Sequence, residues 1–167
     1  LRLMIKFFIS QANRGYLNGL AIEMGESTNS IRKELNHLHS AGYLEKEKSD
    51  NKVEYKANTK HPLFGVLRKV VLKHLGLEDL VERVLERMGP VQQILLTGDY
   101  AKGLDTGTID VVLVGKQLNT EYIEALEEKV EGIIERKVNF YLTSKPNPTQ
   151  LTVLLYENEP TKNKVAL

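Results

Sequence analysis

The chain of 167 residues contains no cysteine. It therefore has no disulfide framework, no thiolate nucleophile and no thiolate metal ligand, a composition that fits a reducing cytoplasm. No apolar run approaches the roughly 18 residues needed to cross a bilayer, so we expect no membrane contact. The apolar start, residues 1–9, lacks a small-residue cleavage site. A signal peptide is therefore not expected, and we predict a cytoplasmic protein.

Basic and acidic residues balance over the whole chain but not within its two halves. Residues 1–74 hold 13 Lys and Arg against 7 Asp and Glu, a balance of +6. Residues 75–167 hold 10 against 15, a balance of −5. This asymmetry predicts two modules with different partners, and the basic half suits a polyanion such as DNA. The plainer interpretation is two solvated surfaces of unequal sign.

The first 60 residues show three amphipathic helical segments followed by two extended segments. The expected helices cover residues 1–13, 17–24 and 28–40, and the expected strands cover residues 44–48 and 53–57. Ser27 or Thr28 can cap the third helix, because a hydroxyl accepts hydrogen bonds from unpaired backbone N–H groups. Three helices followed by two strands with a polar tip predict a winged helix-turn-helix.

This order of segments, with the stretches 20–25, 27–35 and 38–44, resembles the ArsR-type winged-helix family. The resemblance implies a domain over residues 1–60 that binds double-stranded DNA, with its third helix in the major groove. The residues implied at base edges are Thr28, Asn29, Ser30, Arg32 and Lys33. Lys48 and Lys52 in the wing are implied at phosphates. Taken alone, the basic pair on the third helix is better explained as an ordinary solvated face, and winged helices also serve as protein-interaction modules.

Residues 61–89 are predicted to be a helical connector. Pro62 is well placed near a helix start, and apolar residues recur at helical spacing from Phe64 to Leu75 before Gly76 ends the helix. A second helix is expected over residues 78–88. The wide apolar stripe of the first connector helix is the candidate interface for a homodimer, and docking between the two modules is the equal alternative.

Residues 90–158 alternate between apolar strands and one long helix. Strands are expected over residues 91–97, 109–115, 137–143 and 151–156, with a helix over residues 120–136. This pattern predicts a small α/β sheet packed by helices, and the polar residues 159–167 are predicted to form a flexible tail. The fold class expected for the whole chain is therefore mixed α+β and α/β, in two domains.

A glycine-bounded turn over residues 98–103 precedes the second of these strands, which Asp110 enters. The pattern resembles the nucleotidyltransferase fold, the polymerase-beta-like superfamily. In active members the turn presents backbone N–H groups to a triphosphate, and a helix N-terminus suits such an anion. The residues implied as weak nucleotide contacts are Gly98, Asp99, Lys102 and Gly103.

The same resemblance implies a catalytic site that is incomplete. Active members use two carboxylates two residues apart on one strand, which share a face and hold two Mg²⁺ ions, and a third carboxylate on the next strand. The corresponding residues here are Thr108, Asp110 and Asn139, so one acid of three remains. Asp99 replaces a serine, and its carboxylate repels phosphate. We therefore expect a pseudoenzyme without a cofactor, in which Asp110 is a residual catalytic candidate that caps the turn or pairs with Lys102.

The leading hypothesis is a DNA-binding transcriptional regulator, dimeric, whose second domain is a scaffold, a protein-partner surface or a small-ligand sensor. The alternative is an Mg²⁺-dependent nucleotidyltransferase, similar to antitoxin-like relatives that act beside a toxin, which modifies a protein or small molecule. A third reading is a protein-interaction module that touches no DNA. No metal site is expected at His37 and His39, because helix positions two apart point to different faces.

Overall fold

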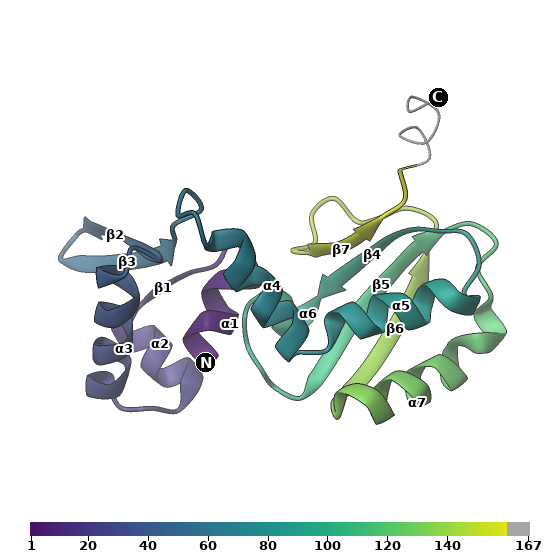
Figure 1. The fold of residues 1–167 in the computed structure, drawn as a ribbon, viewed down its shortest axis with the longest axis horizontal. Coiled ribbons are helices and arrows are strands. Elements are labelled where there is room, and N and C mark those ends of the chain that lie inside the picture. Colours follow the sequence, from purple (N-terminus) through teal and green to yellow (C-terminus); the bar gives the residue numbers. More distant parts are fainter. Residues whose placement is uncertain (160–167) are drawn as a thin grey trace. The chain divides into compact units, whose positions relative to one another are not determined.

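A computed structural model describes residues 1–159 of the chain. These residues form seven α-helices, one short 3₁₀ helix and two β-sheets, a mixed structure consistent with the expected α+β class (Figure 1). The chain divides into two compact units. The first comprises Leu1–His74 with Ala101–Thr106, and the second comprises Leu75–Tyr100 with the described residues from Gly107 onward. Within residues 1–159, no helix is both long and apolar enough to cross a membrane.

The first unit begins with α1 (Arg2–Phe8), whose apolar side chains are buried. The ring of Phe8 packs against that of Phe64 with 5.8 Å between centroids. The sequence predicted a helix as far as residue 13, but the helix ends at Phe8. The Nδ2 atom of Asn13 donates to the carbonyl of Lys6 at 2.9 Å, so the chain turns back toward the helix that it has just left. Asparagine favours such local side-chain contacts over a continued helix.

Two helices and a three-stranded antiparallel sheet follow. The helices α2 (Leu17–Met24) and α3 (Thr28–Ser40) are separated at Gly25, whose φ of 63° ends α2 in the left-handed conformation, as its sequence predicted. The strands β1 (Arg14–Tyr16), β2 (Leu44–Ser49) and β3 (Lys52–Ala57) lie in the order β1-β3-β2. The sequence indicated β2 and β3 but not β1, because three residues are too few to show a period. The unit's last helix is α4 (Phe64–His74).

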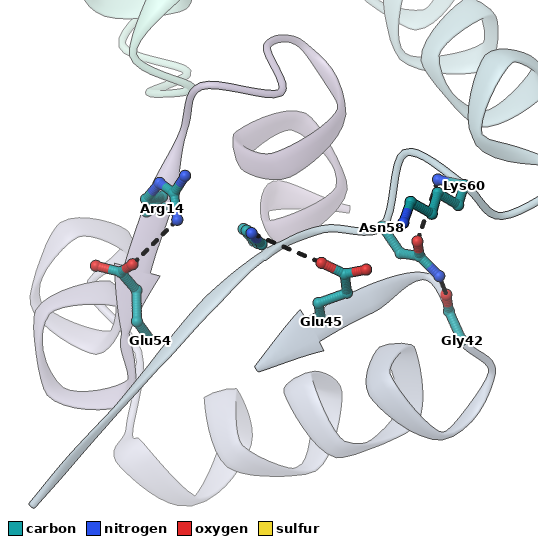
Figure 2. Close-up of polar contacts among 7 residues, drawn as sticks. Arg14, Gly42, Glu45, Glu54, Asn58 and Lys60 are labelled. Atoms are coloured by element: carbon teal, nitrogen blue, oxygen red, sulfur yellow. Dashed lines mark hydrogen bonds and ion pairs between the residues drawn. The ribbon is translucent and has the colours of Figure 1, made fainter. Parts of the chain in front are cut away.

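The β2–β3 hairpin turns through Asp50 and Asn51, which both adopt left-handed conformations, with φ of 48° and 65°. Asp and Asn tolerate this conformation, which suits a tight hairpin turn. Asn58 fastens the base of the hairpin. Its Nδ2 atom donates to the carbonyl of Gly42 at 2.9 Å, and its Oδ1 atom accepts from the backbone N–H of Lys60 at 3.1 Å (Figure 2). The hairpin is thus held at its turn and at its base.

The second unit contains a four-stranded sheet in the order β6-β5-β4-β7, with β5 and β6 parallel and the other pairs antiparallel. Helices α5 and α7 cover one face of this sheet (Figure 1). Its elements are α5 (Leu77–Arg87), β4 (Val91–Thr97), α6 (Gly98–Ala101), β5 (Thr108–Gly115), the 3₁₀ helix η1 (Thr120–Tyr122), α7 (Ile123–Ile134), β6 (Lys137–Thr143) and β7 (Val153–Glu157).

The strands of this sheet send apolar side chains to the face that the helices cover, because successive residues of a strand point to opposite faces. The buried residues of that face include Ile94, Leu96, Ile109, Val111, Leu113, Val138 and Phe140. The opposite face carries the polar residues Thr97, Asp110 and Asn139, which the strand register places side by side. The candidate site of the second unit therefore lies on the face away from α5 and α7.

The helix predicted over residues 120–136 is broken into η1 and α7, and α7 ends at Ile134. Glu135 follows in the left-handed conformation with φ of 57°, at a position that usually carries glycine, so no stop signal for the helix is visible in the sequence. The apolar side chain of Ile133, near the end of α7, is 44% exposed. The strand predicted from residue 151 begins at Val153. The predicted tail lies outside the described residues from position 160 onward.

Candidate nucleic-acid interface

The N-terminal half of α3 presents a polar surface. Ser27 caps the helix, since its Oγ atom accepts from the backbone N–H of Ser30 at 3.1 Å. Ile31 and Leu35, each 1% exposed, fix one side of the helix in the core. The remaining sides face solvent. The five side chains predicted at base edges are all exposed, namely Thr28, Asn29, Ser30, Arg32 and Lys33.

Two of these side chains are already positioned by contacts with residues of α3 or of the segment just before it. The Nη1 atom of Arg32 donates to Oδ1 of Asn29 at 2.9 Å, one helical turn away. The hydroxyl of Ser30 donates to Glu26 at 3.2 Å. A guanidinium has five N–H donors, so this contact leaves Arg32 able to donate to a partner. Holding a long side chain in place before binding reduces the entropy that binding costs.

Among its charged residues, one face of the hairpin carries lysines alone, and the other carries the glutamates together with Lys52 and Lys56. Lys46 pairs with Tyr55, and Lys48 pairs with Val53. Directly paired residues share a face, so both lysines lie on the face that carries the buried Tyr55. The other face carries Glu45, Glu47 and Glu54. Lys48 and Lys52, the first residue of β3, were both predicted at phosphates and are exposed. Lys46 was not singled out, although its alternation with Lys48 was a usable signal.

The acidic face of the hairpin is partly neutralised by ion pairs (Figure 2). Glu54 lies 3.3 Å from Nη1 of Arg14, and Glu45 lies 3.7 Å from Nζ of Lys56. Glu54 also accepts a hydrogen bond from the hydroxyl of Tyr16. This bond, together with the negative charge of Glu54, raises the pKa of the Tyr16 phenol above its ordinary value of 10.0. Glu45 and Glu54 are therefore engaged within the unit.

A groove of about 550 Å³ separates α3 from the hairpin, with the start of α2 as its third wall. Leu35 and Tyr55 line it from the core side, and Arg32 lines it from α3. Tyr16 stands at the groove with Nζ of Lys52 5.6 Å from its ring centroid. Sequence reasoning did not find Tyr16, because a lone aromatic before a helix belongs to no periodic pattern.

Three residues that the sequence singled out in the second unit come together where β4 ends and β5 begins. Gly98 has φ of 66°, and a Cβ atom at this position would lie 2.8 Å from Oδ2 of Asp110. The Nδ2 atom of Asn139 donates to Oδ1 of Asp110 at 3.1 Å, from the paired position on β6. The hydroxyl of Thr97 donates to the backbone carbonyl of Asp110 at 3.2 Å. The Asp110 carboxylate is thus paired with the side-chain amide of Asn139, a pairing that was not predicted from the sequence.

The other predicted residues of the glycine-bounded turn fall into two units. Asp99 follows Gly98 within α6 in the second unit, whereas Lys102 and Gly103 belong to the first. Gly103 has φ of 80°, and a Cβ atom there would lie 2.5 Å from Cα of Lys6. Close packing against α1 therefore accounts for the glycine at position 103 without any nucleotide.

The donor atoms of this cluster are few. Among residues 1–159, no group of three or more His, Asp or Glu side chains is arranged to hold a metal ion. The carboxylate of Asp110 and the amide oxygen of Asn139 are the hard oxygen donors of the cluster, and the amide is the weaker of the two. Comparison with protein-family models, with curated proteins and with solved structures found no match.

Proposed function

We propose that this chain is a transcriptional regulator that binds double-stranded DNA. Its first unit acts as an ArsR-like winged helix-turn-helix, with α3 in the major groove and the β2–β3 hairpin as the wing. Its second unit is a degenerate nucleotidyltransferase-like domain that serves as a scaffold, a surface for a protein partner or a ligand sensor. A cytoplasmic location is part of this proposal.

The observation that carries the proposal is the arrangement of seven polar or basic side chains on two neighbouring elements of one unit. Thr28, Asn29, Ser30, Arg32 and Lys33 on α3, with Lys48 and Lys52 on the hairpin, are all exposed. Residues 1–74, which hold them, carry a balance of +6. Short polar side chains near a helix N-terminus suit base edges, and lysines beside them suit phosphates.

The experiment is a titration of labelled upstream DNA from the protein's own operon at two salt concentrations, with and without Mg²⁺-ATP. We expect salt-sensitive binding that ATP leaves unchanged, because each neutralised phosphate contributes a slope of about −0.9 in log K against log salt. Replacing both Arg32 and Lys33 by Gln should weaken binding and reduce that slope. The matched control replaces Lys116 and Lys145, two exposed residues of the second unit, by Gln, which removes the same charge from outside the proposed interface.

Two results would count against this function. Failure to bind any genomic fragment at low salt would exclude a DNA-binding regulator. Binding that survives the Arg32 and Lys33 replacement unchanged would mean that α3 does not enter DNA. The first unit would then be better explained as a protein-interaction module.

A second candidate function is an Mg²⁺-dependent nucleotidyltransferase that modifies a protein or a small molecule. The convergence of Gly98, Asp110 and Asn139 favours it, because the glycine turn and two of the expected acid positions share one site. Against it, two of the three positions that carry carboxylates in active nucleotidyltransferases are occupied here by Thr108 and Asn139. Mg²⁺-dependent nucleotide binding or transfer to cellular proteins would support this function, and the absence of both would reject it.

We further propose that the regulator is a homodimer through α4. Leu63, just before α4, and Val66 and Val70 on α4 follow one another at helical spacing, and they are 44%, 55% and 50% exposed. Aligned apolar side chains that remain exposed on one helix mark an interaction surface. Sedimentation of the full chain should give twice the monomer mass, and Val66→Glu with Val70→Glu should return it to the monomer mass. A monomeric wild-type chain would contradict the dimer.

A further inference from the structure

The groove between α3, α2 and the hairpin has the size and chemistry of a small-molecule site rather than of a protein-docking surface. Its volume is about 550 Å³, within the range of roughly 300–1,000 Å³ that is usual for ligand pockets. Leu35 and Tyr55, which are 1% and 9% exposed, line it from the core. Leu17 and Val53 extend this apolar lining. An aromatic ring fits such a surface, whereas a lone phosphate would gain nothing from it.

The charged groups of the groove have one sign. Arg32 from α3 and Lys52 from the hairpin line it from two different elements, and none of the described residues that line it is acidic. Two acidic residues act on the rim residue Tyr16. Glu54 is bonded to Arg14 and to the Tyr16 hydroxyl, and Asp50 acts through its charge alone. A ligand here would therefore meet two cations above an apolar surface, which complements an anionic group attached to an aromatic ring.

We propose that this groove binds a small aromatic anion, with its ring against Leu35 and Tyr55 and its acidic group at Arg32 and Lys52. Because these two cations are also proposed DNA contacts, the ligand and DNA would compete for them. The competition rests on the proposed function, whereas the ligand site does not. Such a ligand would release the regulator from DNA without a change in the fold.

The direct test uses 2-naphthoate and its neutral counterpart 2-naphthamide as probes, in nuclear magnetic resonance titrations of the full ¹⁵N-labelled chain. We expect saturable shifts of the backbone signals of Leu35 and Tyr55 with the anion. The amide should bind about tenfold more weakly, since it loses the charge-assisted contacts. Replacing Arg32 and Lys52 by Gln should weaken binding of the anion by a similar factor.

A blocking variant tests the place of binding. Gly19 on α2 lines the groove, and a Cβ atom there would meet no atom within 4 Å, so Gly19→Leu adds a side chain at the groove without a backbone clash. Gly65→Leu on α4 is the matched control, because its Cβ also meets open space but lies outside the groove. Loss of naphthoate binding in Gly19→Leu alone supports the site. Unchanged binding in Gly19→Leu, or equal affinity for both probes, would overturn it.

The competition is measured separately, as release of labelled DNA by naphthoate. Lys33→Gln distinguishes the two functions, because Lys33 is a proposed DNA contact that does not line the groove. This variant should bind naphthoate normally and DNA weakly. Naphthoate binding without release of DNA would overturn the competition and leave the ligand site standing. A chain that binds naphthoate but no DNA would reject the proposed function alone.

Discussion

Asn139 donates a hydrogen bond of 3.1 Å from its Nδ2 atom to Oδ1 of Asp110, across two neighbouring parallel strands. The amide satisfies the carboxylate without adding charge. Asn139→Asp would place two carboxylates at this distance, and they repel each other in the folded state when both are ionised. The loss of stability is therefore present at neutral pH, and it disappears at lower pH because a proton bound by the pair removes the repulsion. We expect a loss of roughly 1–2 kcal/mol at pH 7, measured by urea unfolding.

The control for this prediction is Asp110→Asn, which leaves two amides that can still bond to each other and adds no repulsion. Its stability should not fall as the pH rises from 5 to 7. Addition of Mg²⁺ should restore part of the stability of Asn139→Asp, because a cation between two carboxylates offsets their repulsion. Equal stability of Asn139→Asp at pH 5 and pH 7 would show that the two side chains do not face each other.

Gly98 is required by geometry as well as by conformation. Its φ is 66°, and an added Cβ atom would lie 2.8 Å from the Asp110 carboxylate. Gly98→Ala should therefore destabilise the second unit by about 1–3 kcal/mol. Gly132→Ala on α7 is the matched control, because its Cβ would meet no atom within 4 Å and alanine favours a helix by roughly 0.5–1 kcal/mol. Thermal melts of both variants should shift in opposite directions, and shifts of the same sign would contradict the argument.

The sequence predicted the long elements of both units because their buried residues repeat with a clear period. The strand expected over residues 91–97 matches β4, and the helix expected over residues 28–40 matches α3. What the sequence missed depends on short or non-periodic features. Such features are β1 with three residues, α6 with four and the left-handed Glu135 that ends α7.

The candidate sites, like the fold, could be predicted only in part from the sequence. The exposed face of α3 follows from the positions of its buried residues, and the exposure of its five predicted side chains is confirmed. The groove was not predictable, because Tyr16, Arg32 and Lys52 come from three elements whose packing decides their distances. The bond between Asp110 and Asn139 likewise depends on strand register, which a single sequence does not state.

Tyr16 reports on the acidic face of the hairpin through its phenol. Its pKa is raised first by the hydrogen bond to Glu54 and then by the charge of Glu54. Glu54→Gln removes that charge, so the phenol should ionise at a lower pH than in the wild-type chain. The measurement is a pH titration of ¹³C-labelled tyrosine signals, with Tyr16→Phe to assign the resonance. Glu47→Gln on the same face is the control and should leave the titration nearly unchanged. A Tyr16 titration that is identical in Glu54→Gln would mean that the hydroxyl does not bond to this residue.

Two carboxylates of α7 protect the exposed edge of the second sheet. The backbone N–H groups of Val138 and Phe140, on the edge strand β6, donate to Glu131 at 2.8 Å and to Glu127 at 2.9 Å. Residues four apart on a helix advance by about 6 Å, and residues two apart on a strand advance by about 7 Å. The two carboxylates of α7 are therefore spaced like the two backbone N–H groups of β6. An open edge with free N–H groups would pair with another chain.

Replacing both Glu127 and Glu131 by Ala should therefore lower the free energy of unfolding by about 1–2 kcal/mol per lost bond and promote aggregation on warming. The double Gln variant keeps an acceptor oxygen at each position and should recover most of the loss. Glu128→Ala, an exposed residue of the same helix, is the control for helix propensity. Hydrogen exchange gives the decisive readout, because the amides of Val138 and Phe140 should lose protection in the double Ala variant alone. If those amides exchange as slowly as in the wild-type chain, the two carboxylates do not protect the edge, and the stability loss has another cause.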